Sequence, residues 1–60
     1  MTREDIIAEL NEIEQVGDAA RKHIDVARDC FTRRQEITGR THIEKAIAQL
    51  EQVKVRLEYL

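Results

Sequence analysis

Apolar and small residues recur at alternating intervals of four and three along the first half of this 60-residue chain. This spacing is a heptad repeat, which gathers the side chains into one stripe on a continuous α-helix. A second set of partly apolar residues widens the stripe, as is typical of a helix packed in a bundle. The repeat therefore predicts an all-α fold with a coiled-coil-like seam. The repeating residues are Ile6, Leu10, Ile13, Gly17, Ala20, Ile24, Ala27 and Phe31, and the widening residues are Ile7, Val16, His23, Cys30 and Ile37.

Capping residues predict where the first helix begins and ends. The Thr2 hydroxyl can accept a hydrogen bond from a free backbone N–H of the first turn, and an acidic Asp5 suits that end of the helix dipole. Gly39 can adopt the left-handed conformation that closes many helices. The sequence thus predicts a long helix over residues 3–38.

A T-x-x-E capping box, formed by Thr41 and Glu44, predicts the start of a second helix. Its apolar positions alternate at intervals of three and four, so a short helix is expected over residues 42–60. A connection this short makes the two helices antiparallel neighbours. The apolar positions are Ile43, Ala46, Leu50, Val53, Leu57 and Leu60, with Ile47 beside them.

Gly17 leaves an alternative open. Glycine in a helix interior costs about 1 kcal/mol relative to alanine, so the alternative is a helix that stops at Gly17, with Asp18 capping a new one. The chain would then form a three-helix bundle. The heptad phase passes through Gly17 without interruption, which favours one continuous helix. Gly17, Ala20 and Ala27 would then form a small-residue strip where another helix approaches closely.

The unequal helix lengths predict self-association. A helix of about 36 residues spans roughly 54 Å and one of about 19 residues roughly 28 Å, so the short helix would leave the N-terminal half of the long one uncovered. An uncovered apolar stripe marks an interaction surface, and a two-fold homodimer with four helices is the simplest closed assembly. The expected oligomer interface comprises Ile6, Leu10, Ile13, Val16, Gly17, Ala20 and Ile24.

Composition and charge indicate a single helical domain over residues 1–60. A net charge of −2 argues against bulk binding of polyanions, but the charge is unevenly distributed. Residues 1–20 carry six carboxylates against one arginine, whereas residues 21–45 carry seven lysines and arginines against four carboxylates. One cysteine, no membrane-length apolar run and no signal-peptide pattern make the cytoplasm the expected location. A short chain with its own start Met and two capped helices fits a bacterial or phage accessory protein.

Catalytic and metal-binding patterns are not evident. His23 and Cys30 lie two helical turns apart, too far to share a metal ion, and no histidine or cysteine is spaced to join His42. Cys30 has no activating base within reach and is expected to be buried and inert. The paired acidic residues would face solvent in ion pairs with neighbouring arginines. We therefore expect no enzymatic activity, no metal and no cofactor.

Basic residues near the end of the long helix form the strongest candidate contact site. They could bind phosphates of RNA or DNA, an acidic partner protein, or carboxylates of a second chain. No aromatic residue is interspersed to stack on bases, which weakens the nucleic-acid interpretation. The residues are Arg28, Arg33, Arg34, Arg40 and Lys45.

Together these features predict a small non-catalytic regulatory or adaptor protein that acts through protein–protein interaction as a homodimeric helical bundle. One alternative is a nucleic-acid-binding regulator that uses the arginine cluster, and another is a structural oligomerisation module. The salt dependence of binding distinguishes protein binding from nucleic-acid binding, because phosphate contacts weaken steeply with ionic strength and an apolar interface does not.

Overall fold

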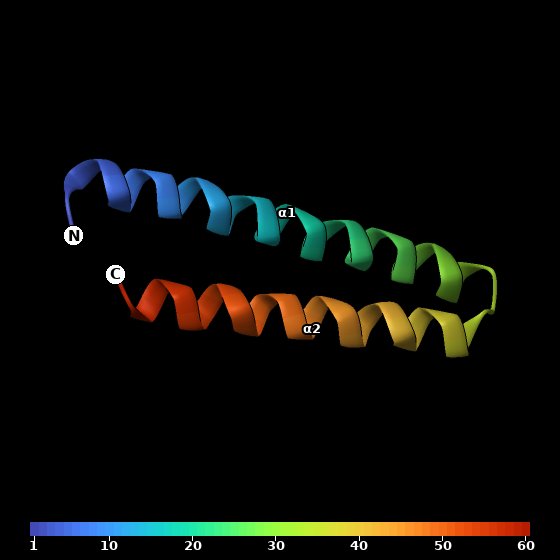
Figure 1. The fold of residues 1–60 in the computed structure, drawn as a ribbon. Helices are drawn as coiled ribbons and strands as arrows, with labels where there is room; N and C mark the ends of the chain where they lie inside the picture. Colours follow the sequence, from blue (N-terminus) through green and yellow to red (C-terminus); the bar gives the residue numbers. More distant parts are fainter.

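Two antiparallel α-helices form the whole molecule in a computed structural model that describes residues 1–60. Helix α1 covers Arg3–Thr32 and helix α2 covers Glu36–Glu58. The helices lie side by side, with both chain termini at one end and the turn at the other (Figure 1). The all-α helical hairpin predicted from the sequence is therefore confirmed. Neither helix has a stretch that is long and apolar enough to cross a membrane.

Helix α1 begins as the sequence predicts and continues through Gly17. The Thr2 side chain accepts a hydrogen bond from the Asp5 backbone, and the Asp5 carboxylate accepts one from the Thr2 backbone. This capping box satisfies two donors that the first turn leaves free. Since Gly17 lies inside one unbroken helix of 30 residues, the three-helix alternative with a break at Gly17 is wrong.

The turn lies six residues earlier than predicted. Helix α1 ends at Thr32 rather than near residue 38, and Arg34 takes the left-handed conformation with φ of 61°. The Gln35 N–H donates to the Cys30 carbonyl and the Arg34 N–H to the Phe31 carbonyl, at 2.7 and 3.1 Å. These two hydrogen bonds form a Schellman motif, which commonly has glycine at the left-handed position but here has an arginine.

Gly39 and the Thr41–Glu44 pair do not mark the helix ends. Gly39 lies buried in the first turns of α2, and α2 begins at Glu36 instead of residue 42. The Thr41 hydroxyl donates to the Ile37 carbonyl one turn back within the helix, so it caps nothing. If residue 39 had a Cβ atom, it would lie 2.8 Å from a ring carbon of Phe31. Gly39 is therefore required for close packing of the two helices.

The earlier turn makes the helices more equal in length than predicted. Thirty residues span roughly 45 Å and twenty-three roughly 34 Å, and Arg56 near the end of α2 contacts Glu9 near the start of α1. Helix α2 therefore covers most of α1. The prediction that the N-terminal half of α1 is uncovered is wrong.

Replacing Arg34 with glycine is expected to stabilise the hairpin by about 0.5 to 1 kcal/mol. A left-handed residue with a Cβ costs roughly 1–2 kcal/mol, which glycine avoids, while the added freedom of the unfolded chain offsets part of the gain. Urea denaturation at fixed protein concentration measures the change. Arg33→Gly is the matched control, because Arg33 has a φ of −90° that any residue adopts, and it should lower stability. Equal effects of the two substitutions would contradict the strain at Arg34.

Candidate interaction surface

The seam between the two helices is built from small side chains. Apart from Gly39 and Ile13, the buried residues are Ala20, Ala27, Cys30 and Ala46. Small residues allow the backbones to approach closely, but they bury little apolar surface and so contribute little hydrophobic stabilisation. Ala20 and Ala27 behave as the predicted small-residue strip, with α2 as the approaching helix. Gly17 does not, since a Cβ built there meets no atom within 4 Å.

Polar side chains form part of the seam at the open end of the hairpin, where both chain termini lie. Arg56 donates hydrogen bonds to Glu9 and to Glu12, each at 2.7 Å. The hydrogen bond with Glu9, followed by that with Glu12, raises the pKa of Arg56 above the usual arginine value. The charge cluster of Arg56, Glu9 and Glu12 favours one register of α2 along α1.

Two histidines meet in the same seam, closer to the turn. The Nδ1 atoms of His23 and His42 lie 2.9 Å apart, and the two rings stack with centroids separated by 5.1 Å. The expectation that His42 has no histidine near it was wrong. Sequence spacing suggests partners only within one helix, whereas this pair joins two helices across nineteen residues.

Exposed large apolar side chains recur along one side of the hairpin and form an apolar face. On α1, Leu10, Ile24 and Phe31 are separated by multiples of seven residues, with Gly17 between the first two. On α2, Ile43, Leu50 and Leu57 are seven residues apart, with Ile47 beside them. The exposed fractions of these large side chains range from 38% to 50%. A groove between the helices at the centre of this face is lined by Ile24, Ala27, Arg28, Phe31, Ile43, Ala46, Ile47 and Leu50. Exposed apolar patches are typical of protein interaction sites, so this face is the candidate interaction surface.

The structure divides the residues of the predicted oligomer interface between two surfaces. Ile13 and Ala20 are buried against α2, while Ile6 and Val16 are half-buried along the same seam. Leu10, Gly17 and Ile24 lie on the apolar face. The second helix supplies as much of this face as the first, which the prediction missed because it assigned the apolar residues of α2 to contacts within the chain.

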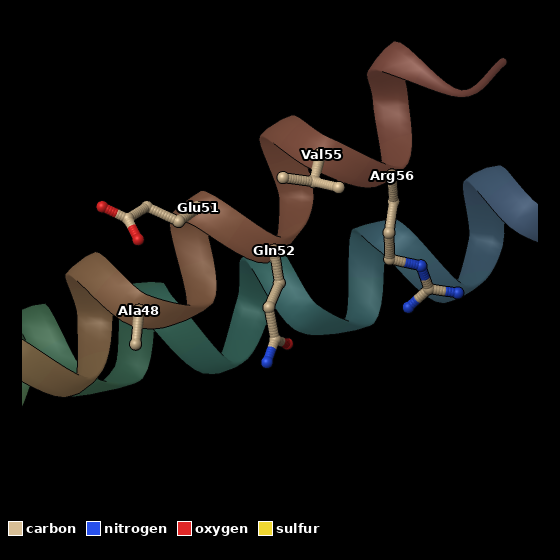
Figure 2. A pocket seen from close by; sticks show the side chains of 5 residues that line it. All are labelled: Ala48, Glu51, Gln52, Val55 and Arg56. Atoms are coloured by element: carbon tan, nitrogen blue, oxygen red, sulfur yellow. The ribbon is translucent and has the colours of Figure 1, made fainter.

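The opposite side of the molecule is polar and shallow. Glu12, Gln15, Gln49, Gln52 and Arg56 line its central depression, together with Val16 and Ala19. Figure 2 shows a second hollow on α2, in which Gln52 and Arg56 extend over α1 while Glu51 points away from it. Because that hollow is formed by α2 side chains alone, it lacks the enclosing walls that a small-molecule site usually has.

The basic residues predicted as a contact patch lie around the turn and the start of α2. Arg28 pairs with Asp25 at 3.5 Å and Arg33 with Asp29 at 3.3 Å. The structure shows no ion pair for Arg34, Arg40 or Lys45, and all three are exposed. The positive charge available to a partner therefore comes mainly from these three residues.

Comparisons with protein-family models, curated proteins and solved structures give no match to this chain. The candidate surface therefore rests on the geometry and chemistry of the hairpin itself.

Proposed function

We propose that this protein is a non-catalytic binding protein that acts as a homodimer, in which two hairpins pack their apolar faces into a four-helix bundle. The apolar face carries the proposal. Its seven large side chains remain about half exposed, while the buried core of one chain consists mainly of alanines. A chain of 60 residues with so small a core is marginal alone and commonly gains stability by oligomerisation.

The size of the apolar face suits a stable dimer. The Cα atoms extend over 48 Å, and two adjacent helices are roughly 20 Å wide. The face therefore measures on the order of 900 Å², close to the roughly 800 Å² that each partner contributes to a typical stable interface. A second copy of the hairpin has an apolar face of the same dimensions.

Charge selects the relative direction of the two copies. The open end of the hairpin holds the acidic residues 1–20, with the neutral segment 46–60, and the turn end holds the basic residues 21–45. A two-fold axis perpendicular to the helices places the acidic end of one chain beside the basic end of its mate. Opposite charges then face each other at both ends, which favours this antiparallel order over the parallel one.

A regulatory or adaptor role follows from this assembly. A two-fold dimer presents every outer surface twice, including the exposed cations Arg34, Arg40 and Lys45, and so offers two equivalent sites to a macromolecule. A protein partner is favoured over nucleic acid for two reasons. Arg28 and Arg33 are already paired with carboxylates, and in the antiparallel dimer each basic turn lies near the acidic end of the mate.

Sedimentation equilibrium across a dilution series tests the proposed assembly. The wild-type protein is expected to have twice the mass of one chain at micromolar concentrations, the range where interfaces of this size hold together. Helix content, followed by circular dichroism, is expected to fall with dissociation, because the monomer keeps only its small alanine-rich core. A fully helical monomer at every concentration would contradict the proposal.

A further inference from the structure

The histidine pair in the seam has a geometry suited to binding a metal ion. His23 comes from the middle of α1 and His42 from the second turn of α2, and both are half-buried. Their Nδ1 atoms face each other at 2.9 Å. Ligand nitrogens at 2.0–2.1 Å from one metal ion, in neighbouring coordination positions, are separated by about 2.9 to 3.4 Å. The observed separation lies at the lower limit of that range.

We propose that His23 and His42 form a two-histidine site for a divalent late transition-metal cation such as Zn²⁺, bound through both Nδ1 atoms. Imidazole nitrogen is a preferred ligand of zinc, copper and nickel. The site goes beyond the proposed dimer and does not depend on it, since both ligands belong to one chain.

Proton positions must change for the cation to bind. The present Nδ1–Nδ1 hydrogen bond requires one ring to carry its proton on Nδ1 and the other to present a lone pair. Coordination requires a lone pair on both Nδ1 atoms, so the proton on the donor ring moves to Nε2 of that ring. From a pair of neutral imidazoles, this change of tautomer releases no net proton to solvent.

The site supplies two ligands, and water occupies the remaining positions. No cluster of three or more histidine, cysteine or acidic side chains with metal-binding geometry is present. Binding is therefore expected to be weaker than at a structural zinc site with four protein ligands. The cation would nevertheless join α1 to α2, and it should stabilise the hairpin because the unfolded chain does not hold the two imidazoles together.

Calorimetric titration of the protein with Zn²⁺ tests this site. We expect one cation per chain, together with a rise in the thermal unfolding midpoint as Zn²⁺ is added. His23→Ala and His42→Ala should each weaken binding by roughly a hundredfold, because a second pre-positioned ligand raises affinity by that order. Cys30→Ala is the matched control: it removes the only thiol, keeps both histidines and should bind as the wild type does.

A spectroscopic measurement keeps the test independent of how well the variants fold. In the wild-type protein, the imidazole proton resonances of both histidines should shift together during the Zn²⁺ titration. Circular dichroism of the metal-free variants establishes that they remain helical. Undiminished Zn²⁺ binding in either folded histidine variant would overturn the proposal. A shift of only one imidazole, or of neither, would overturn it as well.

Discussion

Replacing Leu50 with glutamate is expected to dissociate the proposed dimer, with a rise in its dissociation constant of about a thousandfold. Leu50 lines the central groove of the apolar face and is 47% exposed in the single hairpin. In the dimer it would be buried, and two-fold symmetry would bury two glutamates at once. Replacing a side chain at the centre of an interface commonly weakens binding by about 2–4 kcal/mol. Burying an unpaired carboxylate in an apolar contact costs more than the loss of packing alone. Sedimentation equilibrium measures the change.

Val55→Glu is the matched control for Leu50→Glu. Val55 lies on the same helix and is 50% exposed, but it belongs to the hollow lined by Glu51, Gln52 and Arg56. The added charge, the helix and the initial exposure are therefore comparable. The Val55 variant should remain dimeric. Dissociation by the Val55 substitution, with Leu50→Glu still dimeric, would place the interface on the side of α2 that carries Val55.

Replacing Gly39 with valine is expected to destabilise the protein by about 2 to 3 kcal/mol, typical of an overpacked contact. A Cβ on Gly39 would lie 2.8 and 2.9 Å from two ring carbons of Phe31 and 3.3 Å from the Cβ of Cys30. The Phe31 ring can rotate away, but the Cys30 Cβ moves only with the backbone of α1, so the two helices must separate near the turn. Thermal denaturation at fixed protein concentration should show a midpoint lowered by roughly 10 to 20 °C.

Gly17→Ala provides the control for the Gly39 substitution. Gly17 also lies inside a helix, but apart from its chain neighbours and the nearby backbone of its own helix, a Cβ there meets no atom within 4 Å. Alanine should therefore raise the stability of the single hairpin by about 0.5 to 1 kcal/mol through helix propensity. Opposite signs at the two glycines would show that close helix packing, and not backbone conformation, determines the need for Gly39. Stabilisation by valine at Gly39 would contradict the close approach.

The turn shows why the sequence predicted the hairpin but not its boundaries. Sequence rules assign glycine to the left-handed position that ends a helix, and Gly39 with the T-x-x-E pattern beside it fits those rules well. In the structure, Arg34 occupies that position, and Gly39 instead packs against Phe31 and Cys30. The preference for glycine at the left-handed position is worth about 1 kcal/mol, and the packing between the two helices outweighs this preference.

The seam shows a second limit of reasoning from apolar spacing. The heptad stripe predicts one contact line, but half of its residues, among them Leu10 and Ile24, lie on the open apolar face. The actual seam includes Glu9 and Arg56, which hydrophobic spacing does not detect, and His23, which the spacing placed only among the residues that widen the stripe. A usable signal existed, because Glu9 with Arg56 and His23 with His42 are each placed symmetrically in the sequence about the same position, between residues 32 and 33, where the turn begins. These two pairs are found only when residues of the two helices are matched across an assumed turn.

Isotope-filtered NOE spectroscopy on a mixture of labelled and unlabelled chains tests the central claim most directly, because it detects only contacts between different molecules. The proposed dimer predicts intermolecular NOEs from the methyl groups of Ile24, Ile43 and Leu50, and none from Val55. Intermolecular NOEs confined to Val55 and its surroundings, or none at concentrations where the chain is fully helical, would contradict a dimer formed through the apolar face.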